Sequence, residues 1–138
     1  MVRRLLVVVL VLMIGCVGAR TNDVTIGTSV FHVQIAGTEA LREHGLMGVK
    51  TLAPGGGMLF LWKDVAPREF YMKDTLIPLD LISIRARRVV GVATMVPCKA
   101  EPCLITTTLP ADAALEIEAG TAKRAGIAAG ALVESTAL

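Results

Sequence analysis

Short apolar runs alternate with turn residues along most of this chain. In the segment 31–35, FHVQI, apolar and polar residues alternate with a period of two, which predicts a half-buried β-strand. Further strands are expected at the apolar or β-branched runs 58–62, 70–72, 79–84, 89–96, 104–109 and 114–118, with a last short strand near Leu132 and Val133. The pattern predicts a mainly β fold, an antiparallel β sandwich or barrel-like single domain with one or two short helices.

Two segments depart from the strand pattern. Thr38 can cap a short helix whose first turn carries Glu39, and the glycines at 45 and 48 can end it. Residues 120–126 form a second possible helical turn between two glycines, and the PGGG run at 54–57 predicts a tight turn. Since no repeat or linker interrupts the chain, residues 25–134 are expected to form one domain.

The N-terminus has the pattern of a signal peptide. Arg3 and Arg4 precede the uncharged segment 5–19, and Arg20 ends that segment. A membrane-spanning helix needs about 20 apolar residues, which is more than this segment supplies. We therefore predict that residues 1–19 are a signal peptide and that the protein is exported.

Two cleavage sites compete within the signal peptide. The residues MIGC at 13–16 resemble a bacterial lipobox, in which the Cys is lipidated and becomes the new N-terminus. The alternative site is VGA at 17–19, where ordinary signal peptidase would release a soluble periplasmic or secreted protein. We favour the lipobox, because lipidation accounts for Cys16 and leaves an even number of cysteines for the folded domain. The expected location is the cell envelope, with a lipid on Cys16 as the membrane anchor.

Export also removes the apparent basicity of the chain. The full sequence has 14 basic and 12 acidic residues, and without Arg3 and Arg4 it has 12 of each. Binding of nucleic acid depends on clustered basic side chains that contact several phosphates. A neutral chain with no basic run longer than Arg87-Arg88 is not expected to bind nucleic acid.

Several sequence blocks occur in a fixed order along the domain. They are GLM at 45–47, GMLF at 57–60, FYMKDT at 70–75, LIPLD at 76–80, PC at 97–98 and 102–103, and LE with a following Gly at 115–120. Together these blocks resemble the DUF192 family of small, mostly bacterial and archaeal domains of unknown function. The resemblance implies the same β-rich fold. Four positions depart from it. Tyr71 stands where the family usually has Trp, and Asp74 where it usually has Asn. Val49 stands where a basic residue is common, and Ala131 where Asp is frequent.

The segment 70–80, FYMKDTLIPLD, places polar residues in an apolar region. On a regular strand Lys73 and Thr75 would share one face and Asp74 would lie on the other. Our hypothesis is a polar pocket in which an anionic or hydroxyl-rich ligand meets Lys73 and Thr75, with Asp80 or Glu116 as a carboxylate partner. Asp74 is a further candidate for ligand binding. The alternative is structural, since the same groups could satisfy backbone and charge inside a small β domain.

No recognisable catalytic motif accompanies these residues. The chain has two histidines, His32 and His44, and no serine in a nucleophile elbow. We therefore expect a non-catalytic envelope module that binds a small polar ligand, a glycan or an envelope partner. The alternative is a hydrolase that acts on an envelope polymer with two of its carboxylates, as glycosidases do.

The remaining cysteines, Cys98 and Cys103, are predicted to form a disulfide, because export places them in an oxidising compartment. The soft side chains of Met47, Met58, Met72 and Met95, with the same two cysteines, are of the kind that binds Cu(I). Methionines more simply fill irregular core space, and the CKAEPC spacing does not suit zinc. No metal or cofactor is predicted.

Overall fold

The computed structural model describes residues 22–138. The predicted signal peptide, with Cys16, lies outside the described residues. Within 22–138, no helix is long and apolar enough to cross a membrane.

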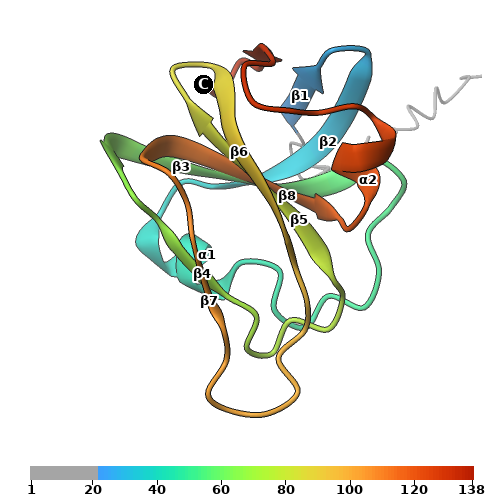
Figure 1. The fold of residues 1–138 in the computed structure, drawn as a ribbon, viewed down its shortest axis with the longest axis vertical. Helices are drawn as coiled ribbons and strands as arrows, with labels where there is room; N and C mark the ends of the chain where they lie inside the picture. The colour runs from blue at the N-terminus through green and yellow to red at the C-terminus, as the bar shows by residue number, and fades with distance from the viewer. Residues whose placement is uncertain (1–21) are drawn as a thin grey trace, which may run out of the picture.

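The fold is a curled sheet of seven strands with a separate two-stranded ribbon (Figure 1). The large sheet has the order β6-β5-β8-β3-β2-β1-β9, and the ribbon consists of β4 and β7. The elements are β1 (Asn22–Ile26), β2 (Ser29–Ala36), α1 (Glu39–His44), β3 (Gly56–Ala66), β4 (Glu69–Tyr71), β5 (Leu79–Arg85), β6 (Arg88–Met95), β7 (Ile105–Thr107), β8 (Ala111–Glu118), α2 (Thr121–Arg124) and β9 (Val133–Glu134). The prediction of a mainly β fold with two short helices is confirmed.

The structure corrects three details of the expected architecture. β2 and β3 pair in parallel, because the chain crosses over through α1 between them instead of turning in a hairpin. β3 continues to Ala66, beyond the predicted end of this strand at residue 62. β1, which the apolar pattern did not predict, pairs with β2 on one side and β9 on the other.

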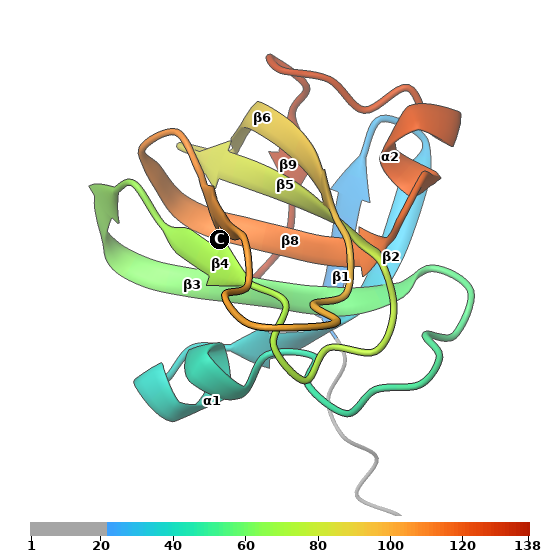
Figure 2. The same cartoon turned by 60° about the horizontal axis from the view of Figure 1, so that its bottom comes forward.

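Side chains of the central strands alternate between two apolar cores. On β8, Leu115 and Ile117 belong to the first core, whereas Ala114 belongs to the second. The second core lies on the face of the sheet that the β4 ribbon covers (Figure 2). Its buried members are Ala36, Leu46, Met58, Phe60, Phe70, Met72, Leu79, Leu81, Met95 and Ala114.

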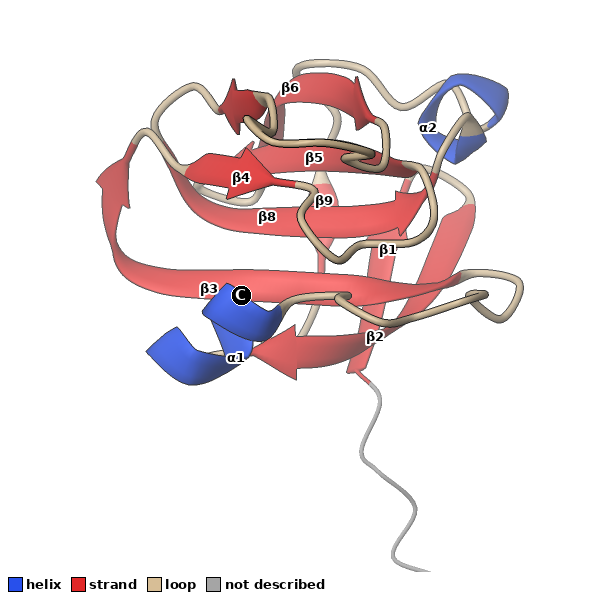
Figure 3. Cartoon of the chain, turned by 90° about the horizontal axis from the view of Figure 1, so that it is seen from below, coloured by secondary structure: helices blue, strands red, loops and turns tan. Residues whose placement is uncertain are grey.

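Helix α1 forms where the capping pattern predicts it. The Thr38 side chain accepts a hydrogen bond from the Leu41 amide at 3.3 Å, and Gly45 ends the helix with φ of 51°. Arg42 fixes the helix to the sheet, because its Nη1 donates to the Leu61 carbonyl of β3 at 2.9 Å. The helix thus lies at the end of β2 and alongside β3 (Figure 3).

The two cysteines lie in the loop between β6 and β7. Their sulfur atoms are 2.08 Å apart and their Cα atoms 5.4 Å apart, so the pair can form the predicted disulfide. The Glu101 carboxylate lies within 4.8 Å of both sulfurs, but sulfurs bonded to each other are not available as thiolate ligands for a metal.

Gly57, in the GMLF block, permits the closest approach between two central strands. A Cβ at this position would overlap the backbone oxygen of Glu116 and lie 3.0 Å from Ile117 Cγ2. A side chain here would push β3 and β8 apart, because both contacts are with a buried and hydrogen-bonded neighbouring strand.

We therefore expect Gly57→Ala to lower the free energy of unfolding by about 1 to 3 kcal/mol, as overpacking in a core does. Urea denaturation followed by the fluorescence of Trp62, the one Trp of the chain, measures this change. Gly91→Ala on β6 is the matched control, since the nearest atom to its Cβ would be Ser83 Oγ at 3.9 Å. A Gly57→Ala variant as stable as Gly91→Ala would show that the strands tolerate the side chain.

Candidate functional site

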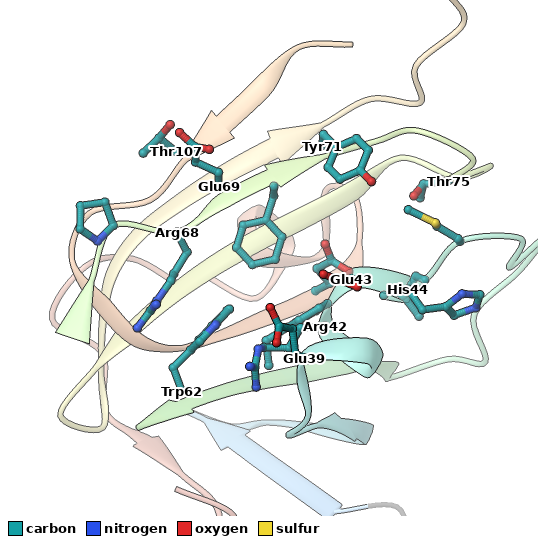
Figure 4. A pocket seen from close by; sticks show the side chains of 17 residues that line it. Glu39, Arg42, Glu43, His44, Trp62, Arg68, Glu69, Tyr71, Thr75 and Thr107 are labelled. Atoms are coloured by element: carbon teal, nitrogen blue, oxygen red, sulfur yellow. The ribbon is translucent and has the colours of Figure 1, made fainter. Parts of the chain in front are cut away.

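A pocket of about 600 Å³ opens between α1 and β4, over the second core (Figure 4). Its lining comes from α1 and the loop after it, from β3, from residues 67–71, and from Thr75, Thr107 and Glu116. The pocket is therefore built from segments that are far apart in sequence.

Glu116 lies in the middle of the sheet that floors this pocket. It is opposite Met58 of β3 and opposite Leu81 of β5, and the residue is 5% exposed. Within residues 22–138 no donor forms a hydrogen bond with its carboxyl group, whose oxygens are open to the pocket and not fully enclosed. Burial raises the pKa of Glu116 from 4.5 to about 7, because desolvation disfavours the charged form. Near neutral pH the group is therefore present in both protonation states.

Three aromatic rings form one wall of the pocket. Phe60 and Trp62 are stacked, with centroids 6.2 Å apart, and Phe70 meets both rings edge-on at 5.3 and 6.2 Å. Phe60 and Trp62 are two residues apart on β3, so both side chains lie on the face of the strand that lines the pocket. Edge-to-face arrangements of this kind stabilise ring clusters beyond their buried area.

Two arginines hold Trp62 in place. The guanidinium carbons of Arg42 and Arg68 lie 5.6 and 4.7 Å from the Trp62 ring centroid, within cation–π range. Arg42 Nη1 donates to two backbone carbonyls, and Arg68 Nη2 donates to both the backbone and the side chain of Asp64. These donors are thus already used within the fold.

Acidic side chains surround the mouth of the pocket. Glu39, Glu43 and Glu69 line it and are exposed, and His44 lies next to Glu43 at the end of α1. Figure 4 shows Glu43 and Tyr71 on opposite sides of the opening.

The family pattern of DUF192, described as "Uncharacterized ACR", matches residues 22–135. This chain belongs to the DUF192 family. A comparison with curated proteins found no match.

Two solved structures resemble this DUF192 protein. A protein of unknown function from Novosphingobium aromaticivorans is 39% identical, over 81% of this chain and 83% of the other, with a TM-score of 0.73. A protein from Sinorhizobium meliloti, whose description proposes that it is a transcription regulator, is 31% identical over 90% of this chain and 100% of the other, with a TM-score of 0.80.

The family segment 70–75 does not form the regular strand that the sequence suggested. β4 ends at Tyr71, the Thr75 amide donates to the Met72 carbonyl, and Asp74 has φ of 55°. The expected alternation of Lys73, Asp74 and Thr75 is therefore wrong. Asp and Asn tolerate this left-handed backbone better than most residues do, which explains their use at position 74 in a turn.

Thr75 and Glu116 of the predicted site line the pocket, whereas Lys73 and Asp74 do not. The Lys73 ammonium lies 3.8 Å from Glu101, with both side chains more than half exposed, so the pair adds little stability. The Asp74 carbonyl accepts a hydrogen bond from the Gly48 amide at 2.9 Å.

Asp80 has a structural role on the opposite face of the sheet. It pairs with Ile117 of β8, whereas its neighbour Leu81 pairs with Glu116, so Asp80 and Glu116 point in opposite directions. Its two oxygens accept hydrogen bonds from the Thr94 hydroxyl at 2.7 Å and from the Ala122 amide of α2 at 2.9 Å. Asp80 and Glu116 therefore cannot act together on one ligand.

The aromatic wall and the two arginines were not predicted from the sequence. The spacing of Phe60 and Trp62 was a possible signal, because residues two apart on a strand share a face. Their partners Arg42, Arg68 and Phe70 come from other segments, and only the fold brings them together.

The raised pKa of Glu116 predicts a specific dependence of stability on pH. The folded state binds this proton more tightly than the unfolded chain does, so the contribution is complete below pH 4.5 and is lost as pH rises to about 7. Relative to Glu116→Gln, the wild type should lose on the order of 3 kcal/mol of unfolding free energy over this range. Urea denaturation at pH 4.5, 5.5, 6.5 and 7.5 measures the difference.

Glu118→Gln is the control for this comparison, since Glu118 lies on the same strand but is exposed. It should follow the wild type within about 0.5 kcal/mol, as most surface substitutions do. A stability difference between wild type and Glu116→Gln that does not change with pH would contradict the burial of an unpaired carboxyl group.

Proposed function

We propose that this DUF192 protein is a non-catalytic binding protein of the cell envelope, and that the pocket between α1 and β4 takes a small polar ligand. The observation that carries the proposal is the Glu116 carboxyl group, which is buried, has no hydrogen-bond partner in the described part of the chain, and lines an open pocket.

Burial of an ionisable group without a partner costs several kcal/mol, and structural carboxylates avoid this cost through hydrogen bonds. Asp80 is such a group, because two donors satisfy it. Glu116 lacks such donors. Its strand neighbours Met58 and Leu81 are apolar, so an apolar residue of similar size would suit this position better if the role were only structural. A ligand that supplies the missing partner gives a reason for the carboxyl group.

The geometry favours binding over hydrolysis by paired carboxylates. A glycosidase needs two carboxyl groups on either side of the scissile bond. Asp80 faces away from Glu116, and Asp74 lies in a turn outside the pocket. The carboxylates that do share the pocket, Glu39, Glu43 and Glu69, are exposed at its mouth.

The regulatory description of the Sinorhizobium meliloti relative is not extended to this protein. The chain without residues 1–15 has equal numbers of basic and acidic residues, and nucleic-acid binding requires clustered positive charge.

The first test is a ligand screen by NMR with the purified ¹⁵N-labelled protein. Sugars, amino acids, amines and organic acids are the probes, and a pocket ligand should shift the Trp62 indole resonance and the amides of α1 and β8. Glu116→Leu should abolish these shifts while the fold is retained, and Glu118→Gln should leave them intact. Shifts that persist in Glu116→Leu, or a complete lack of shifts at the pocket, would contradict the proposal.

The proposed location is tested separately by metabolic labelling with a palmitate analogue. The wild type should incorporate the label and fractionate with membranes, because the lipid on Cys16 is the anchor. Cys16→Ser should lose the label. An unlabelled wild type, or equal labelling of Cys16→Ser, would argue against the lipoprotein and in favour of cleavage after Ala19.

A further inference from the structure

The geometry points to a cationic ligand: we propose that the pocket binds a primary or secondary ammonium group, with the Glu116 carboxylate as its counter-ion. This inference rests on the proposed binding function of the same pocket and specifies the chemical class of the ligand.

The charges that face the pocket support a cation. Carboxylates come from three elements, with Glu39 and Glu43 on α1, Glu69 on β4 and Glu116 on β8. The strands on either side of Glu116 add no charge at its position, since Met58 and Leu81 are its neighbours there. The positive groups are Arg42, Arg68 and His44.

Both arginines already direct some of their donors at the protein itself. Arg42 donates to the Gly37 and Leu61 carbonyls, and Arg68 donates to the Ala111 carbonyl and to Asp64. Both guanidinium groups lie over Trp62. The two arginines hold Trp62 in the wall of the pocket, whereas the Glu116 carboxyl group at its floor remains available to a ligand.

The aromatic groups near the floor suit an ammonium ion as well. Phe60 and Phe70 line the pocket together with Glu116, and ring faces attract cations in a desolvated site. A carboxylate combined with phenyl rings therefore offers an ammonium group both a charge partner and an apolar surface for its carbon chain. A neutral hydroxyl group could form the hydrogen bond but would leave the buried charge uncompensated.

Competition between the ligand and a proton gives this inference a distinct signature. An ammonium group binds the ionised form of the carboxyl group. An alkyl amine with a pKa near that of Lys, about 10.4, stays charged up to pH 9, so the charge of the ligand does not change between pH 6 and pH 8. Because burial raises the pKa of Glu116 to about 7, the affinity for an amine should fall roughly tenfold from pH 8 to pH 6. A ligand that bonds to the neutral carboxyl group would show the opposite trend or none.

The test uses matched pairs of probes, benzylamine with benzyl alcohol and butylamine with butanol, titrated by NMR at pH 6 and pH 8. At pH 8 each amine should shift the Trp62 indole resonance and bind at least about tenfold more tightly than its alcohol. Glu116→Gln should remove the preference for the amine and its dependence on pH.

His44 needs a control of its own, because it is a second ionisable side chain in the lining of the pocket. His44→Gln should keep the decrease in affinity from pH 8 to pH 6. If His44→Gln loses it, or if Glu116→Gln still prefers the amine, Glu116 is not the counter-ion and the inference is wrong.

The outcomes separate this inference from the proposed function. If neutral or anionic compounds from the screen bind in the pocket and neither amine does, the ammonium specificity is wrong and the binding function stands. If no compound of any class shifts the pocket resonances, both are wrong.

Discussion

The pairing of β8 with two neighbours is the constraint on which the rest of the structure depends. β3 binds one edge of β8 and β5 binds the other, so β8 lies inside the sheet and its side chains are divided strictly between two cores. Gly57 permits the close contact with β3. Because alternation is fixed on this strand, Glu116 must point to the face of the second core, where it lines the pocket.

The pocket is a space beside the second core that the core side chains do not fill. The aromatic wall of Phe60, Trp62 and Phe70 closes one side of the pocket. Arg42 and Arg68 lie over the Trp62 ring and donate hydrogen bonds to backbone carbonyls, which fixes the position of the ring. Helix α1 and the segment 67–71 therefore stand apart and leave space above Glu116. On the other face of the sheet, Asp80 receives hydrogen bonds from Thr94 of β6 and Ala122 of α2, so the fold does supply partners for a carboxylate with a structural role.

Much of the fold could be predicted from local patterns. Alternation located β2, Thr38 and Gly45 located α1, and the ordered blocks indicated the family. β1 was missed because its pairing with β2 defines it as a strand more than its own sequence does. Gly27 and Thr28 join the two strands in a hairpin. The segment from Lys73 to Thr75 was misjudged, since an apolar run beside it suggested a strand while the backbone turns at Asp74.

By itself, the sequence determined the family, the β-rich class and the short list of polar residues in apolar surroundings, because these depend on composition and on nearest neighbours along the chain. Only the tertiary structure decided which of those residues share a site. It placed Asp80 and Glu116 on opposite faces, removed Lys73 and Asp74 from the pocket, and brought Arg42, Trp62 and Arg68 together. Strand register and long-range packing fix these relations, and neither is encoded in a local pattern.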